Sequence, residues 1–323
     1  MSTMRPLLEI PVTRPFDFRL MIFSHGWVDL APFDWDPDRA ALTAVIKTWG
    51  TKAFGVTITA VRDNARGQFL RIDKVAGGRH GKRDVDILRK KIDWMFRLDE
   101  DFVPFQRRCA RAKGLRWVKR LGLGAFLRNG DLFEEFVKVL LTTNVNWAGT
   151  QSMNTKLIHH FGTPLEGGRG AAASLRAFPG PEAIAASTEA ALRQKARVGY
   201  RAPFLLEFAG AVASGALDLE RFAGSDLDSD ALAKELGRLK GFGPYAVSAL
   251  LLTLGRYDRL ILDSWIRKKT AERYFDGKKV PDSAINEVYA PWGEWKTLAC
   301  WFECAYDTWF KDELNKGGQK TKV

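Results

Sequence analysis

The residues best suited to chemistry in this sequence are a single acid and a glycine-rich turn upstream of it. Asp263 directly follows the apolar run Leu260–Leu262, and Gly241 and Gly243 mark the turn. Glycine adopts backbone angles that other residues avoid, so the chain can reverse direction sharply there. Amide groups left free at such a turn attract an anion such as phosphate. A phosphate-binding turn followed by one carboxylate is what chemistry on a DNA strand would need.

Two helices are expected to hold this turn in place. Leucines at helical spacing predict a first helix over residues 230–240. Pro244 suits the first turn of a second helix, predicted over residues 245–254, and Gly255 suits its end. The turn is therefore predicted to be a hairpin between two helices, with amide groups pointing outward at the start of the second helix.

These residues resemble the helix-hairpin-helix and catalytic aspartate motif of the base-excision DNA glycosylases, the HhH-GPD superfamily. Hairpin, second helix, loop and aspartate occur together in the family's order and at its spacing, so the match is more specific than a Gly-x-Gly turn alone. The resemblance implies that Asp263 is the catalytic group. It also implies a hairpin that binds DNA phosphate, made of Lys240, Gly241, Phe242, Gly243 and Tyr245.

A structural role is the alternative for Asp263. Aspartate is a common N-cap, and a helical pattern begins at Ser264. A carboxylate has two oxygens, so capping and catalysis are compatible.

The first part of the chain reads as β-rich. Residues 54–61 alternate between apolar and polar side chains, and residues 16–23 and 69–72 are further strand candidates. Residues 84–98 then show apolar side chains at helical spacing. This layout resembles the small antiparallel β domain, with its closing helix, at the front of the alkylpurine and 8-oxoguanine glycosylases.

Helical patterns dominate the rest of the chain. Besides the hairpin pair, helices are predicted over residues 132–141, 148–161, 183–192, 202–213, 264–275 and 295–310. The predicted fold class is α+β, with an N-terminal antiparallel β domain over residues 1–98 and a mostly α-helical helix-hairpin-helix glycosylase domain over residues 99–314. Residues 315–323 are predicted to be a basic flexible tail.

Two polar segments are candidates for contact with DNA beside the reacting nucleotide. A glycosylase must extrude its target from the base stack and fill the gap. One segment resembles the family loop that probes this gap and implies roles for Asn144 and Asn146. The other resembles a motif in which Tyr200 wedges between bases and Arg201 contacts the opposite strand. The alternative is that the asparagines cap a helix end and the tyrosine lies at the edge of the core.

The residue after the hairpin decides which chemistry is expected. Family members that also nick the strand carry a lysine two residues after the second hairpin glycine, where it forms a Schiff base with the sugar. This chain has Tyr245 there, and a phenol cannot form an imine. The resemblance therefore implies a monofunctional glycosylase that leaves an abasic site. Asp263 would stabilise positive charge on the sugar and orient or deprotonate the attacking water.

The damaged base is predicted from the residues that the resemblance places in the base pocket. By position Trp301 would stack on the flipped base, with Thr297 facing the base edge and Tyr245 nearby. An aromatic, weakly polar pocket favours a cationic alkylated purine such as 3-methyladenine. Ala249 replaces a cysteine expected for oxidised guanine, so 8-oxoguanine or a deaminated base is the alternative. A purely structural alternative places Trp301 and Phe302 in the core.

The composition agrees with a polyanionic partner. The chain has 50 Lys and Arg against 38 Asp and Glu, a net charge of +12, which favours double-stranded DNA with a damaged base. The basic run 107–120 could extend the DNA track, or it could be a solvated face. Three cysteines cannot supply the four ligands of the iron–sulfur cluster of some relatives, and the four histidines lack metal-ligand spacing. No metal and no cofactor are expected, apart from a structural monovalent cation that the hairpin could hold.

Two further expectations concern location and rival functions. The sequence shows no signal-peptide pattern and no long apolar run, so a cytoplasmic monomer is expected, associated with the nucleoid if the source is bacterial. A non-catalytic protein that senses damaged DNA is the rival function. Asp263 argues against it, because phosphate binding gains nothing from a nearby negative charge.

Overall fold

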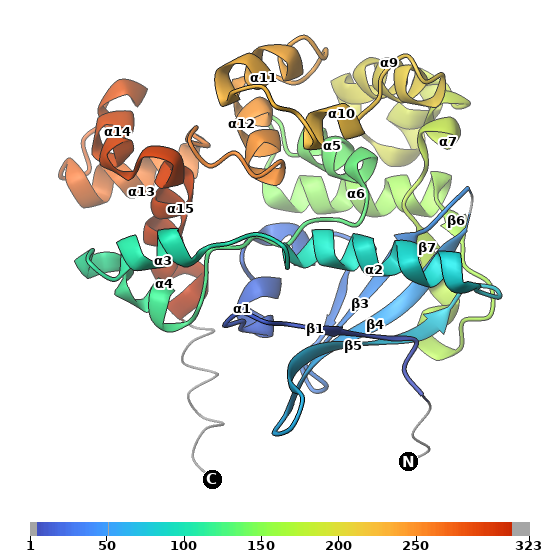
Figure 1. The fold of residues 1–323 in the computed structure, drawn as a ribbon. Coiled ribbons are helices and arrows are strands. Elements are labelled where there is room, and N and C mark those ends of the chain that lie inside the picture. The colour runs from blue at the N-terminus through green and yellow to red at the C-terminus, as the bar shows by residue number, and fades with distance from the viewer. Residues whose placement is uncertain (1–4, 51, 312–323) are drawn as a thin grey trace. The chain divides into compact units, whose positions relative to one another are not determined.

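The computed structural model describes residues 5–50 and 52–311 (Figure 1). The predicted tail, residues 315–323, lies outside this range. The chain divides into two compact units, each made of two segments. The first unit comprises Met1–Glu100 and Ala125–Glu220, and the second comprises Asp101–Gly124 and Arg221–Val323. These units group the chain differently from the predicted domains, whose boundaries remain predictions.

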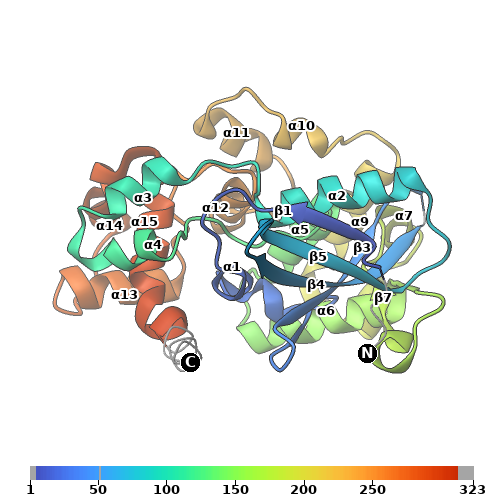
Figure 2. The same cartoon turned by 60° about the horizontal axis from the view of Figure 1, so that its bottom comes forward.

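A five-stranded antiparallel sheet forms the front of the first unit, as the sequence predicts. Its spatial order is β1-β5-β4-β3-β2. Figure 2 shows the sheet in a second view, in which the bottom of Figure 1 has come forward. The bounds are β1 Leu8–Pro11, β2 Asp34–Asp36, β3 Ala41–Lys47, β4 Ala53–Asp63 and β5 Gly67–Ala76. The turn between the two longest strands is fixed by Asp63, whose side chain accepts hydrogen bonds from two following amides at 2.8 Å. Strand β3 was not predicted, although it lies inside the sheet.

Residues 16–23, predicted as a strand, instead contain the helix α1 (Phe18–Ile22). The Asp17 side chain accepts a hydrogen bond from the Leu20 amide at 2.9 Å and so caps the helix start. Every helical residue except Arg19 is buried. The apolar run is therefore a short core helix, because one N-cap outweighs the β propensity of its aromatic residues.

The helix α2 packs on the sheet, and further helices and short strands follow it in the first unit (Figures 1 and 2). Their bounds are α2 Lys82–Phe96, α5 Leu132–Leu141, α6 Trp147–Phe161, β6 Thr163–Pro164, β7 Arg176–Ala177, α7 Pro181–Ala185, α8 Glu189–Ala191 and α9 Ala202–Ala213. The single helix predicted over residues 183–192 is broken into α7 and α8. Thr188 starts the second piece by accepting a hydrogen bond from the Ala191 amide at 3.1 Å.

The described part of the second unit is helical. Its helices are α3 Val103–Cys109, α4 Arg116–Arg120, α11 Ser229–Leu236, α12 Pro244–Thr253, α13 Ser264–Tyr274, α14 Asp282–Tyr289 and α15 Lys296–Ala305. The short α10 (Glu220–Ala223) precedes α11 at the passage from the first unit. The sequence patterns missed α3, α4 and α14, which are all eight residues or shorter. No helix in the described ranges is long and apolar enough to cross a membrane.

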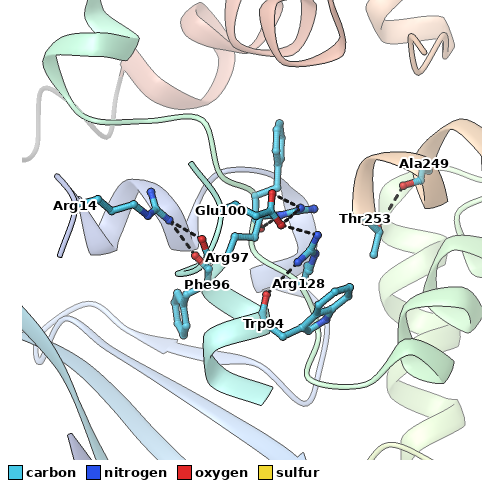
Figure 3. A network of polar contacts seen from close by, with 9 residues as sticks. Arg14, Trp94, Phe96, Arg97, Glu100, Arg128, Ala249 and Thr253 are labelled. Carbon is cyan, nitrogen blue, oxygen red and sulfur yellow. Dashed lines mark hydrogen bonds and ion pairs between the residues drawn. The ribbon is translucent and has the colours of Figure 1, made fainter. Parts of the chain in front are cut away.

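A buried cation network closes the first unit where the chain leaves and re-enters it (Figure 3). Arg97 and Arg128, both almost fully buried, share the Glu100 carboxylate, each at 2.8 Å. The Arg128 guanidinium also lies 3.7 Å from the ring centre of Trp94. Because Glu100 and Ala125 are the residues at the two segment ends, this network ties those ends together.

The pKa of His25, in the same unit, is lowered to about 3 by burial and by the positive charge of Arg97. In the unfolded chain the imidazole titrates near its ordinary value of about 6.5. Between these values the unfolded chain binds the extra proton, so folding stability falls as the pH drops below about 6.5. We expect a loss of about 2 kcal/mol between pH 6.5 and 5, measured by urea unfolding. The His25→Gln variant should lose this dependence, and parallel curves for variant and wild type would contradict the assignment.

Candidate functional site

The helix-hairpin-helix exists as predicted, with a shorter first helix. The helix α11 ends at Leu236 rather than at residue 240, and tight turns follow it, closed by hydrogen bonds such as that from the Phe242 amide to the Leu239 carbonyl at 3.1 Å. Gly241 has a φ of 88°, the left-handed region that favours glycine. Gly243 has an ordinary φ of −74° and caps the start of α12.

The hairpin offers backbone donors to an anion. Among residues 5–50 and 52–311, no acceptor receives a hydrogen bond from the amide groups of Gly241 or Gly243. A Cβ at Gly243 would meet nothing within 4 Å, so the fold itself gives no reason for glycine there. A ligand that approaches the backbone closely does give one. The exposed side chain of Lys240 suits the same anion.

Phe242 differs from Lys240 in that its side chain belongs to the core. Its side chain is buried, and its amide donates to the Leu239 carbonyl. Phe242 therefore anchors the hairpin in the core, and its predicted contact with phosphate stays a prediction.

The end of α12 directs the chain toward Asp263. Gly255 has a φ of 84°, its amide donates to the Leu252 carbonyl at 3.2 Å, and the Arg256 amide donates to the Leu251 carbonyl at 2.8 Å. This pair of bonds is the Schellman motif that commonly stops a helix at glycine. The predicted end of the helix is thus confirmed.

The loop between α12 and Asp263 is held by α15 and α11. The Thr297 hydroxyl donates to the Arg259 carbonyl at 2.5 Å, and the Thr297 amide donates to the Tyr257 carbonyl at 2.8 Å. The Arg259 guanidinium pairs with Asp230 at 2.6 Å. Thr297, predicted to face the base edge, is instead only 3% exposed and bonded to this loop. In the structure Thr297 positions the loop, and its place in a base pocket stays a prediction.

Replacing Thr297 by valine should loosen this loop. The change keeps the shape but leaves the partly buried Arg259 carbonyl without this donor, at a cost of about 1–3 kcal/mol of unfolding free energy. We expect lower turnover with unchanged DNA affinity, measured by chemical unfolding and by kinetics on the same samples. Thr297→Ser, which retains the hydroxyl, is the matched control. Equal losses in both variants would contradict a role for the hydroxyl.

Asp263 is a helix N-cap, as the structural alternative expects, and its position is compatible with the predicted catalytic role. Its Oδ1 accepts a hydrogen bond from the Ile266 amide at 2.7 Å and caps α13. Its Oδ2 has no hydrogen-bond partner within the described ranges, and the side chain is half-buried. Arg267, one turn along, pairs instead with Asp282 at 2.7 and 2.9 Å. The carboxylate is therefore fixed by one oxygen and offers the other. The pKa of Arg267 is raised chiefly by its hydrogen bond to Asp282 and, to a smaller extent, by the charge of Asp263, so Arg267 lies near the carboxylate without forming an ion pair with it.

Two tryptophans flank this helix start. Trp265 is the second residue of α13, and its ring centre lies 5.8 Å from that of Trp301 on α15. Both are half-buried, whereas the neighbouring Phe302 is fully buried. The core alternative thus holds for Phe302 but not for Trp301. Sequence reasoning missed Trp265, although its place two residues after the acid was a usable signal. Tyr245 is half-buried in the first turn of α12.

In the first unit, the structure brings the two predicted gap-contacting segments together. The Tyr200 hydroxyl lies 3.0 Å from the Asn144 amide nitrogen, from which it accepts a hydrogen bond, and 3.2 Å from the Thr143 hydroxyl. Asn144 has a φ of 48°, so the loop turns sharply there. Tyr200 is 45% exposed, and Val145 is also exposed. An aromatic ring and an apolar tip therefore project from one hydrogen-bonded cluster, and the sequence pattern had not singled out Val145.

Arg201 is bonded inside the first unit, and its contact with the opposite DNA strand stays a prediction. The side chain is 5% exposed, and all three guanidinium nitrogens are used within the unit. Nε donates to the Leu140 carbonyl at 3.2 Å, Nη1 donates to the Val198 carbonyl at 3.3 Å, and Nη2 donates to the Thr143 carbonyl. Arg201 instead braces the loop that carries Asn144, and its guanidinium lies 4.6 Å from the Tyr200 ring centre.

Asn146 proves to be a helix cap. Its side chain accepts a hydrogen bond from the Gly149 amide at 2.8 Å at the start of α6. The adjacent Trp147 stacks on Trp27 with ring centres 6.3 Å apart, and it donates to Asp29 at 3.1 Å. The bonds of Asn146 and Trp147 thus fix the end of the loop that carries Asn144, and the Asn146 side chain remains exposed there.

Within the described ranges, no three His, Cys, Asp or Glu residues are grouped so that they could hold a metal ion. Cys300 and Cys304 are buried one turn apart on α15. The Glu303 carboxylate between them accepts hydrogen bonds from Tyr274 at 2.6 Å and Tyr289 at 2.9 Å.

No family model matches the sequence, and no curated protein matches it. Solved structures do match it along most of its length. The 3-methyladenine DNA-glycosylase from Archaeoglobus fulgidus is 17% identical with a TM-score of 0.73, over 94% of this chain and 99% of that one. The Clostridium acetobutylicum 8-oxoguanine glycosylase/lyase, in complex with double-stranded DNA containing cytosine opposite 8-oxoG, is 18% identical with a TM-score of 0.67, over 90% and 92%.

MBOgg1, in complex with a low affinity DNA ligand, is 19% identical with a TM-score of 0.72, over 92% of this chain and 94% of that one. At such identities the likeness concerns the fold. The chain therefore has the fold of the helix-hairpin-helix (HhH-GPD) DNA glycosylases.

Proposed function

We propose that the protein is a monofunctional DNA glycosylase that excises an alkylated purine. The observation that carries this proposal is Asp263, held as an N-cap by Oδ1 while Oδ2 has no partner in the described part of the chain. The same unit supplies a hairpin with two unbonded backbone donors. Solved glycosylases of both the 3-methyladenine and the 8-oxoguanine type share the fold.

The proposed reaction is hydrolysis of the bond between base and sugar. The hairpin amides hold a backbone phosphate, and the Tyr200 cluster fills the space left by the extruded nucleotide. As the C1′–N bond breaks, its electron pair leaves with the base and positive charge develops on the sugar. The Asp263 carboxylate stabilises that charge and accepts a proton from the attacking water, whose oxygen bonds to C1′. The products are a free base and an abasic site.

The absence of a Schiff-base step is proposed from Tyr245. It occupies the first turn of α12, where the resemblance expects the lysine of the lyases. We expect that borohydride traps no protein–DNA adduct during turnover, whereas a glycosylase/lyase control is trapped. A trapped adduct would show that another amine, such as that of Lys240, supplies lyase activity.

The substrate class is proposed from the tryptophan pair. Electron-rich rings attract a cationic base, and both Trp265 and Trp301 retain exposed surface near the start of α13. Incubation with methylated DNA and with oxidised DNA, followed by identification of released bases, separates the candidates. Release of 3-methyladenine from the first is expected. Release of 8-oxoguanine alone would favour the alternative and leave the glycosylase proposal standing.

Tyr200→Ala should weaken base extrusion without touching the chemistry. Loss of the wedge ring removes stacking that offsets part of the few kcal/mol needed to open the duplex, so we expect about 10- to 30-fold slower release from duplex DNA. Release from a single strand should change little. Tyr200→Phe, which keeps the ring but loses the bonds to Asn144 and Thr143, is the matched control. Equal slowing on both substrates would contradict the wedge role.

We extend the proposal to the remaining expectations: a monomer without a metal or cofactor, acting on double-stranded DNA in the cytoplasm. The rival is a non-catalytic sensor of damaged DNA. It would bind lesions through the same hairpin but release no base.

A further inference from the structure

The second unit carries a group of cations that the proposed reaction does not use. Residues 102–130 contain eight Lys and Arg but no Asp or Glu. Six of these cations lie on or between α3 and α4, which pack against each other (Figures 1 and 2). We call them the basic face: Arg107, Arg111, Lys113, Arg116, Lys119 and Arg120.

The basic face has no internal counter-charge. All six side chains are exposed, and within residues 5–50 and 52–311 none makes an ion pair or a side-chain hydrogen bond. The cations of α13 in the same unit behave differently, since Arg267 pairs with Asp282 and both Lys268 and Lys269 pair with Glu272. Clustered like charges repel one another, so this face gains more from a polyanion than a face of paired charges does.

The face is also rigidly mounted. The Trp117 ring packs on Phe302, Tyr306 and Phe310, with ring centres 5.1–5.9 Å apart. The Gln106 side chain donates to the Leu123 carbonyl at 3.0 Å and ties α3 to the segment after α4. Helices held in this way lose little backbone freedom when the cations on them bind an array of charges.

Arg108 does not belong to the basic face, because its side chain is already hydrogen-bonded inside the unit. Its guanidinium donates to the carbonyl groups of Trp292 and Pro291 and lies 5.5 Å from the Trp292 ring centre. It serves as an internal brace between α3 and the turn before α15, so the seven-residue basic run divides into one structural cation and six available ones.

We propose that the basic face binds the phosphodiester backbone of duplex DNA, as a second contact separate from the hairpin. Duplex DNA presents closely spaced phosphates with condensed counterions, and release of those counterions favours binding to unpaired cations. The inference rests on the proposed function only in taking DNA as the polyanion. Its role is to hold the protein on DNA irrespective of sequence or damage, because phosphate contacts carry no base information.

The test compares binding to a short undamaged duplex at several salt concentrations. The face variant carries Arg107→Gln, Arg111→Gln, Arg116→Gln and Lys119→Gln. The control variant removes the same charge from exposed cations of the first unit that also lack ion pairs, through Arg39→Gln, Arg62→Gln, Arg79→Gln and Lys90→Gln. Each lost phosphate contact lowers the slope of log affinity against log salt by about 0.9.

We expect the face variant to bind about tenfold or more weakly, with a slope reduced by about 2 or more, while the control stays close to wild type. A conservative variant with Lys at the three Arg positions and Arg at 119 should retain the wild-type slope. If the fourfold variant does not fold, Lys113→Gln with Arg120→Gln provides a smaller change with the same direction.

Equal weakening in the face and control variants would overturn the proposal, because net charge alone would explain it. Unchanged DNA affinity in the face variant would also overturn it. The basic face would then bind a different polyanion, such as an acidic protein. Base release by the face variant, measured at saturating protein, tests the proposed reaction separately from the basic face, because this variant leaves Asp263 unchanged. A protein that releases no base can still show the salt-dependent difference on undamaged DNA.

Discussion

Asp263→Asn should lower the rate of base release by about 100- to 10 000-fold while leaving DNA affinity intact. The lower figure corresponds to loss of one electrostatic stabiliser, and the upper figure includes loss of a general base. Asparagine is as good an N-cap as aspartate, so the bond to the Ile266 amide can be kept. The substitution therefore isolates the charge of the free oxygen from the capping role.

The measurement is single-turnover base release with the variant in excess over substrate. Glu272→Gln, which removes an exposed carboxylate paired with Lys268 and Lys269 on the same helix, is the matched control and should release base at the wild-type rate. A fully active Asp263→Asn protein would reduce Asp263 to a helix cap. Unfolding curves on the same samples check that both variants are folded.

Lys138→Ala should destabilise the protein by about 3–5 kcal/mol, because it leaves a buried carboxylate without its partner. Lys138 is fully buried on α5 and pairs with Glu134 at 2.7 Å, and its ammonium group donates to the Asn129 side chain at 2.6 Å. The same helix ends at the loop that carries Asn144. Chemical unfolding should report the loss, and base release from duplex DNA should fall with it.

A double variant separates the ion pair from simple packing. Lys138→Met with Glu134→Leu replaces both charges by apolar side chains of similar length, which is often neutral for a buried pair. We expect it to recover most of the stability lost in Lys138→Ala. A double variant as unstable as the single one would contradict the ion-pair explanation, because methionine refills the space beside Phe33 and Phe178. The loss would then come from the bond to Asn129, which both variants remove.

The hairpin was predictable because its signals are local. Gly241 and Gly255 both take left-handed angles, which few other residues adopt, and Asp263 caps the helix that it precedes. The antiparallel sheet was predictable from alternation in β4. These features depend on the chain's own backbone preferences, so sequence periodicity and residue type are sufficient to find them.

The roles of Arg201 and Thr297 could not be read from the sequence. Both are polar residues next to functional segments, and each was expected to reach DNA or base. In the structure, Arg201 donates to carbonyl groups at the end of α5 and in the loop after it, and Thr297 donates to the carbonyl of Arg259. Such contacts join residues about 40–60 positions apart, and no local pattern distinguishes a brace from a ligand contact.

The segment 16–23 shows a different limit. Its apolar residues satisfy either a strand or a buried helix, and periodicity does not separate these over so short a run. The deciding contact is the Asp17 cap. Likewise, Trp265 lies two positions after Asp263 in the sequence, but it packs against Trp301, which is 36 residues later on another helix. The sequence alone does not show this contact.

The most direct measurement is base release by the wild-type protein, in the presence of chelator, from duplexes that each carry one defined lesion. We predict release of an alkylated purine, with strand breaks only after heat or alkali treatment. Tight binding to a lesion with no release from any duplex would contradict the proposed glycosylase and favour a sensor of damaged DNA.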